Sequence, residues 1–252
     1  MPISIANAQA IESIRAAGRI IDEIFKRIDK MDLRRMKTLN LNDRIDTLIR
    51  ENDASPAFLN YRGFPKSCCI SLNNEVVHGI PDSRRIEDGD IVKIDVGVNY
   101  HGYIADAART FPAGSISPEV QQMLEVTKQA LRNGIAAAKP ENKISDISRA
   151  IQTTVEEKGY SVVRELTGHG IGKNLHEEPA IPNFVNSGPE FFIKPGMALA
   201  IEPMVNMGKH DVFTAPNRWT IMTRDNSLSC HYEDTILILE DGNLNLTKIV
   251  EN

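Results

Sequence analysis

The sequence lacks the features that mark secreted, membrane-bound and nucleic-acid-binding proteins. It has three cysteines, Cys68, Cys69 and Cys230, and an odd number with two neighbours excludes a disulfide framework and an all-cysteine zinc site. Basic residues are scattered and the net charge is -5, which argues against a nucleic-acid-binding patch. Neither a signal peptide nor an apolar run that could cross a membrane is visible. These absences predict a protein of the reducing cytoplasm that binds neither nucleic acid nor membrane.

What the sequence contains is typical of a globular α/β domain. The chain is 41% hydrophobic and 25% charged, and no low-complexity linker divides it, so we expect one domain over residues 1–252. Apolar periodicity and capping residues predict four helices, over about residues 5–30, 40–52, 117–138 and 145–158. Ser117 is the expected N-cap of the third helix, and Gly159 is the expected C-cap of the fourth.

Strands account for most of the remaining chain. Residues 69–81, CISLNNEVVHGIP, predict strand, turn and strand. Residues 90–100 and 103–111 alternate and are joined by the turn signal His101-Gly102, which predicts a hairpin. From Val162 onward the chain is expected to form strands and turns, with long strand segments at 196–205, 218–223 and 230–239.

Two of these strands have similar patterns. The segments IEDGDIVKIDVGV from Ile86 and IKPGMALAIEPMV from Ile193 place Gly, Ile and Val at matching positions, and Asp95 falls where Glu202 falls. A chance match of this length is the alternative. A real repeat predicts two related halves whose acids converge at a pseudo-twofold centre.

Four acidic residues interrupt the most apolar strands, namely Asp95, Asp106, Glu202 and Glu233. Acidic side chains are disfavoured within strands and costly to bury unpaired. A single one could pair with an arginine, but few basic residues lie in these strands. Four carboxylates together with the imidazole of His169 suit two divalent cations that share bridging oxygens. The absence of thiols from this set argues against a purely structural zinc site.

Five separated segments resemble the methionine aminopeptidases of the bacterial type I class, in peptidase family M24. These are YRGFPKSCCISLNNEVVHGIP, GDIVKIDVGVNYHGYIADAARTF, TGHGIGKNLHEEP, IEPMV and SLSCHYEDTI, and the resemblance covers nearly the whole chain. Several motifs in one order are more specific than one short pattern. The resemblance implies the α/β pita-bread fold, with a curved antiparallel sheet, helices on its outer face and pseudo-twofold halves.

The resemblance also implies a role for each candidate metal ligand. Asp106 and Glu233 would bridge two divalent ions, Asp95 would complete one coordination shell, and His169 with Glu202 would complete the other. Cobalt, manganese, iron and zinc all suit such ligands, so the identity of the metal stays open.

A monovalent cation near Asn73 and Ser229 is a further feature of the family. A loop asparagine beside a serine is ordinarily turn chemistry, so the sequence leaves this second cation site open.

The implied reaction is hydrolysis of the first peptide bond by a metal-activated water. Glu202 would carry the proton, His176 would donate a hydrogen bond to the substrate carbonyl, and His78 would position the scissile amide. Considered without the motif, His176 would be interpreted as a histidine of a surface loop. Its position in the family motif favours the functional role instead. Glycines around His169 permit a turn and close approach. The remaining histidines are expected in turns or on the surface, at His101, His210 and His231.

The methionine side chain would occupy an apolar pocket. By resemblance its lining residues are Phe58, Tyr61, Phe64, Cys69, Leu175 and Trp219. Each could instead be an ordinary core residue, and Cys68 with Cys69 is expected to serve packing. Phe58 and Leu175 differ from the cysteine and phenylalanine often found in the family, which could alter the pocket. Asp234 stands where histidine is frequent and could change the charge around the metal pair.

Two other readings compete with this one. Xaa-Pro aminopeptidases and prolidases share the implied fold and metal set, but they usually carry an additional N-terminal domain. A metal-free binding module should have lost ligands, whereas all five are present here. The short interval from His176 to Glu202 leaves no room for the insertion of the type II enzymes.

The expected substrate is the N-terminal methionine of newly synthesised proteins, with a small second residue preferred. We expect a monomer, and transient contact with the ribosome stays open.

Overall fold

The computed structural model describes residues 5–248. The helices are α1 (Ala8–Asp29), α2 (Thr38–Arg50), the 3-10 helix η1 (Tyr61–Gly63), α3 (Pro118–Ala137) and α4 (Ile144–Glu156). The strands are β1 (Ser55–Pro56), β2 (Cys69–Leu72), β3 (Glu75–Val77), β4 (Ile91–Tyr100), β5 (Tyr103–Pro112), β6 (Ser161–Val162), β7 (Thr167–Gly170), β8 (Glu177–Pro182), β9 (Ala198–Ile201), β10 (Met204–Asn206), β11 (Val212–Thr214), β12 (Ile221–Thr223), β13 (Ser229–His231), β14 (Asp234–Leu239) and β15 (Gly242–Asn245).

The four helices form where the sequence predicts them, with ends that differ by a few residues. Asn7 caps α1 by accepting a hydrogen bond from Ala10 N, and Ser117 caps α3 by accepting one from Val120 N. Gly159, at φ +81°, follows the end of α4 as expected. Among residues 5–248, the structure contains no helix with the length and apolar character of a membrane span.

The hairpin of β4 and β5 has two chemically different faces. Asp95 lies opposite Ala108 and Gly97 lies opposite Asp106, while β2 pairs with the other edge of β4. Because successive side chains alternate between faces, one face is apolar except for Arg109 and packs against α1, where the rings of Phe25 and Phe111 are 6.1 Å apart. The other face carries polar residues, which are Lys93, Asp95, Asp106 and Thr110.

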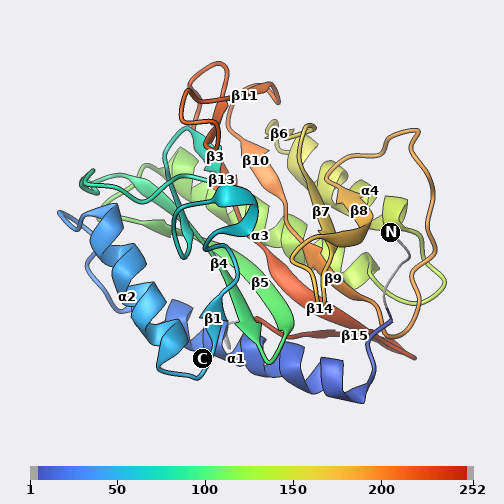
Figure 1. Ribbon diagram of the computed structural model, residues 1–252. Helices are drawn as coiled ribbons and strands as arrows, with labels where there is room; N and C mark the ends of the chain where they lie inside the picture. Colours follow the sequence, from blue (N-terminus) through green and yellow to red (C-terminus); the bar gives the residue numbers. More distant parts are fainter. Residues whose placement is uncertain (1–4, 249–252) are drawn as a thin grey trace.

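The second half of the chain builds a five-stranded sheet in the order β15-β14-β9-β7-β8. Its outer face is covered by α3 and α4, through one buried cluster that includes Leu131, Ile151, Ile201 and Ile236. Strand β14 adjoins β5, because Thr235 Oγ1 donates to Asp106 O at 2.7 Å and accepts from Asp106 N at 2.9 Å. Figure 1 shows α1 and α2 on one side of the strands and α3 and α4 behind them. The predicted α/β fold, with helices outside antiparallel strands, is confirmed.

Two strands predicted as continuous are broken at their acidic residues. Residues 196–205 form β9 and β10, separated at Glu202-Pro203, and residues 230–239 form β13 and β14, separated at Tyr232-Glu233. Strand β9 pairs with β14, whereas β10 pairs with β13, so both segments change sheets at the break. Pro203 has no N–H for a ladder hydrogen bond, which favours the break there.

Candidate metal centre

All the predicted site residues line a single hollow, which we call the site hollow. Its volume is about 130 Å³, and its walls come from β2, β4, β5, β7, the strand breaks and the loops around Tyr61, Leu175 and Trp219. The lining residues are Phe58, Tyr61, Arg62, Phe64, Cys69, His78, Asp95, Asp106, His169, Leu175, His176, Glu202, Trp219 and Glu233. Asp95 and Glu202 converge there, as the sequence repeat predicted, and Arg62 is the one member that the sequence did not predict.

His169 is fixed in the tautomer that a metal ligand requires. Its Nδ1 lies 2.9 Å from the carbonyl oxygen of Gly170, which can only accept, so Nδ1 carries the proton. The lone pair of Nε2 is therefore free, and Nε2 lies 3.6 Å from Glu202 Oε1. Gly170 permits this geometry, since a Cβ there would lie 2.2 Å from Glu178 O across the β7–β8 pairing.

The four carboxylates of the site hollow repel one another. Burial raises the pKa of Asp95, Glu202 and Glu233 well above the usual value, and repulsion from neighbouring carboxylates adds to the shift. Burial raises the pKa of Asp106 to about 7. Such a cluster is costly to keep charged unless a cation neutralises it.

The donor set fits divalent metal. Asp106, His169 and Glu233 each offer a ligand atom, and these atoms lie within 4.8 Å of one another. Among the described residues, Asp95 Oδ1, Asp106 Oδ1 and Glu233 Oε1 are buried without a hydrogen-bond partner. Buried oxygen atoms normally have partners, so these atoms are directed at something that the chain does not supply. Carboxylate oxygens with one imidazole nitrogen suit Mn²⁺, Fe²⁺, Co²⁺ or Zn²⁺.

His176 lies next to the candidate metal ligand His169. Its ring is 4.3 Å from the His169 ring between centroids, and its Nδ1 lies 2.8 Å from the Tyr61 hydroxyl. Burial lowers the pKa of His176 to about 4, with Arg62 adding to the effect, so the ring is neutral at neutral pH. When Tyr61 donates to Nδ1, the single proton of the ring lies on Nε2, which makes that atom a donor.

His78 is held in an unusual backbone conformation at the edge of the site hollow. Its φ is +58°, and burial lowers the pKa of its imidazole to about 4. The next residue, Gly79, donates from its N–H to Ser71 Oγ at 2.9 Å, and a Cβ on Gly79 would lie 2.3 Å from Ile70 O. Strand β2 therefore fixes the backbone that carries His78.

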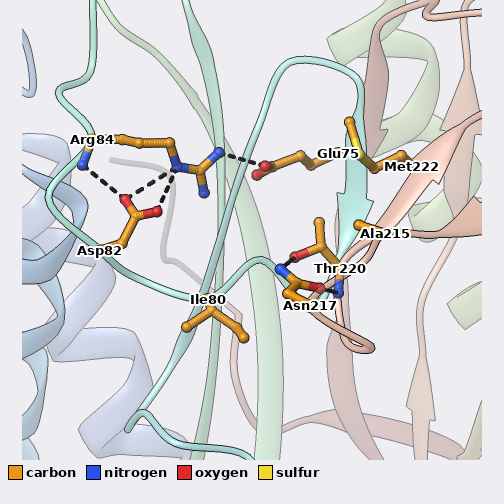
Figure 2. A pocket seen from close by; sticks show the side chains of 8 residues that line it. All are labelled: Glu75, Ile80, Asp82, Arg84, Ala215, Asn217, Thr220 and Met222. Atoms are coloured by element: carbon orange, nitrogen blue, oxygen red, sulfur yellow. Dashed lines mark hydrogen bonds and ion pairs between the residues drawn. The ribbon is translucent and has the colours of Figure 1, made fainter.

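A second hollow of about 390 Å³ lies beside this segment (Figure 2). The guanidinium of Arg84 joins Glu75 to Asp82, and Asn217 donates to Thr220 Oγ1 at 2.8 Å. Thr220 Oγ1 also lies 3.4 Å from His78 O. These contacts hold the backbone on both sides of His78 and Trp219 from outside the site hollow.

The apolar part of the site hollow has the predicted lining. The rings of Phe64 and Trp219 meet edge-on, with 5.1 Å between centroids. Phe58 and Leu175 are buried against the same cluster. Cys69 is buried with its thiol unpaired to another cysteine, and burial raises the pKa of that thiol well above its usual value.

The prediction that His231 lies in a turn or on the surface is wrong. His231 ends β13, is 1% exposed, and has its Nε2 3.5 Å from Glu202 Oε2. Both of its ring nitrogens lack a hydrogen-bond partner among residues 5–248. The burial of His231 results from the pairing of β13 with β10, in which His231 lies opposite Met204.

Asp234 is paired by the chain itself, outside the site hollow. Its side chain lies on the opposite side of β14, where Arg109 Nη2 donates to Oδ1 at 2.5 Å. Thr247 and Asn245 donate to its two oxygens, each at 2.8 Å. The chain itself therefore pairs this carboxylate, and the negative charge of Asp234 makes only the smallest of several contributions to the raised pKa of Glu233.

This fold, with four carboxylates and an imidazole around one hollow, defines a metal-dependent hydrolase. The model of metallopeptidase family M24 matches residues 12–240, and the chain belongs to this family. A methionine aminopeptidase of Clostridium perfringens is 43% identical over 98% of this chain and 99% of its own length. The crystal structure of methionine aminopeptidase from Rickettsia prowazekii superposes with a TM-score of 0.95 and 39% identity, over 98% of this chain and 100% of that chain. A prolidase from Pyrococcus furiosus is more distant, at TM-score 0.80 and 27% identity, and the match covers 66% of its length.

Proposed function

We propose that this protein removes the N-terminal methionine from newly synthesised proteins, using two divalent metal ions. The observation that carries the proposal is the site hollow itself, where unpartnered carboxylates lie beside an apolar pocket. The names of the C. perfringens and R. prowazekii relatives support methionine as the residue removed. The catalytic unit would be one domain that spans residues 1–252.

Five residues would hold the metal ions, with Asp106 and Glu233 between the two ions, Asp95 on one side, and His169 with Glu202 on the other. When bound, the ions would lower the pKa of a water so that hydroxide is available near neutral pH, and would polarise the scissile carbonyl. The fixed Nε2 lone pair of His169 and the buried free oxygens of Asp95, Asp106 and Glu233 support this assignment.

Glu202 would carry the proton during hydrolysis. Its carboxylate lies between the imidazoles of His169 and His231, at 3.6 and 3.5 Å, and burial raises its pKa well above the usual value, which favours the uptake of a proton. The proton would pass from the attacking water to the leaving amine. This keeps the proton count balanced as the peptide bond breaks.

Two neutral histidines would bind the reacting amide. The Nε2–H of His176 would donate to the carbonyl oxygen as negative charge develops there, and a hydrogen bond donated by the Tyr61 hydroxyl to Nδ1 would hold the ring in the required tautomer. His78 would contact the scissile amide or the adjoining backbone. The wall formed by His78 and the sheet would restrict the second residue of the substrate to small side chains.

The methionine side chain would lie against Phe58, Phe64, Cys69, Leu175 and Trp219. This part of the hollow is small and lined by apolar side chains, which favours an unbranched apolar side chain at the chain end. The acidic cluster next to it would receive the free α-amine, and this would restrict the protein to N-terminal residues.

The test is methionine release by metal-stripped protein from Met-Ala-Ser and Met-Lys-Ser peptides, during titration with Mn²⁺, Fe²⁺ or Co²⁺. We expect metal-dependent release from Met-Ala-Ser and little from Met-Lys-Ser. Asp106→Asn should abolish release, whereas Asp241→Asn, on an exposed turn, should leave it unchanged.

Cleavage of Xaa-Pro peptides without methionine release would instead assign the protein to the prolidase branch. No cleavage of either substrate with any metal, in a folded protein, would contradict a catalytic function.

A further inference from the structure

Lys93 is a buried lysine on the polar face of β4, two residues before Asp95. Its side chain is 1% exposed, although lysine is almost never fully buried unless its ammonium is paired. Lys93 lies opposite Ser71 on β2 and opposite Thr110 on β5. The side chain therefore extends from the sheet toward the segments that carry β3 and β13.

The Lys93 ammonium is bound to the turn between β2 and β3. Its Nζ donates to the carbonyl oxygen of Asn73 at 2.7 Å, and the N–H of Ser229 donates to the same oxygen at 3.0 Å. The Asn73 side chain is tied to Asp90 and Ile91, so the carbonyl cannot turn away. The ammonium thus lies where Asn73 and Ser229 meet.

The surroundings of Lys93 are buried and include one buried acidic side chain, that of Glu75. Glu75 is itself 7% exposed and accepts hydrogen bonds from Leu72 N and from Arg84.

This arrangement does not fit the monovalent cation that the family resemblance implies near Asn73 and Ser229. The Asn73 carbonyl oxygen, which such an ion would need, already accepts from Nζ and from Ser229 N. A sodium or potassium ion beside the ammonium would also meet like-charge repulsion in a region of low dielectric constant.

We propose that the Lys93 side chain takes the place of this monovalent cation, so that the protein carries its own cation there and needs neither potassium nor sodium. Because the ammonium belongs to the chain, it links β4, which carries Asp95, to the turn before His78 and to the segment before Glu233. The way these elements pack together would then be independent of the salt composition of the solution. This inference does not depend on the proposed peptidase activity.

The test compares melting temperatures of the metal-stripped protein in potassium, sodium and tetramethylammonium chloride at equal ionic strength. Wild type should melt at the same temperature in all three salts. Lys93→Ser, which removes the ammonium and leaves room, should melt lower in tetramethylammonium chloride and recover by several degrees, saturably, in potassium or sodium chloride. Lys158→Ser, at an exposed lysine, is the matched control and should behave as wild type.

A second measurement keeps the inference testable if Lys93→Ser does not fold. Thallium(I), followed by its own NMR signal, is a probe for potassium sites, and wild type should show no saturable binding. Saturable thallium binding by wild type, or a saturable rise of its melting temperature in potassium or sodium, would overturn the inference. A folded Lys93→Ser that responds to neither ion would also overturn it, since no cation site would then exist to be replaced.

Discussion

Glu233 and Asp234 are neighbours in the chain, yet they lie in two buried polar clusters of opposite character. Glu233 points into the site hollow, where its Oε1 has no hydrogen-bond partner among the described residues. Asp234 points to the other side of β14, where Arg109, Thr247 and Asn245 satisfy both of its oxygens. Both carboxylates are buried, so burial alone does not distinguish them.

The difference between the clusters is whether the chain supplies the counter-charge. The cluster around Asp234 is complete and serves structure, because it joins β5, β14 and the C-terminal segment. The cluster around Glu233 is incomplete, and a buried charge that stays unpaired indicates a missing ligand. Substitutions in the incomplete cluster should therefore lower activity and spare stability, whereas substitutions in the complete cluster should lower stability and spare activity.

The largest effect is expected for Glu202→Gln, on the incomplete side. It removes a proposed metal ligand and the proton carrier, so methionine release should fall by about 10²–10⁴-fold or more. Stability of the metal-stripped protein should be unchanged or higher, because one repelling carboxylate is gone. Peptide assays and thermal melting of the same preparation measure both quantities. A variant that keeps wild-type activity would exclude the proton-carrier role.

On the complete side, Asp234→Asn should cost about 3–5 kcal/mol of unfolding free energy, since it leaves Arg109 buried without its carboxylate. Urea denaturation measures this loss. Specific activity of the folded fraction should stay within a few-fold of wild type. The double variant Arg109→Met/Asp234→Asn should recover part of the stability, and failure to do so would show that the pair is not the source of the loss.

A change of pH should separate the two clusters without any substitution. In the metal-stripped fold the pKa of Asp106 is about 7, above its usual value of 3.8, so the folded state holds a proton that the unfolded chain releases. Its contribution to stability is complete below the lower value and is lost as pH rises through about 7. We expect the melting temperature of metal-stripped protein to fall by several degrees between weakly acidic and weakly basic pH. Saturating Mn²⁺ should remove most of this fall, and an equal fall with and without metal would contradict a metal site.

The smallest effect is expected for His231, which borders the incomplete cluster. His231→Ala should lower metal affinity or activity by about 10-fold to 100-fold, as is usual for a group that orients a metal ligand, and His231→Gln should lose less. Metal titration followed by activity measures both. His101→Ala, at an exposed turn, is the control. Equal results for His231→Ala and His101→Ala would mean that His231 does not orient Glu202.

Much of this site could be predicted because its residues are unusual for the segments in which they occur. Acids in apolar strands are visible in the sequence, and so are the glycines beside His169. The role of His231 was not visible, because its burial depends on β13 pairing with β10, a contact between distant segments. The change of sheets at Glu202-Pro203 and Tyr232-Glu233 was missed for the same reason. Apolar periodicity contains no information about which strand is the neighbour in the sheet. The partner of Asp234 lies far away in sequence, on Arg109.

The burial of Cys69 affects the reactivity of its thiol toward electrophiles and oxidants. The thiol borders the pocket, but burial raises its pKa and keeps it protonated, and the thiolate is the form that reacts with electrophiles and oxidants. Phe58, which also lines the hollow, offers no sulfur. Electrophilic reagents directed at cysteine should therefore react slowly at Cys69.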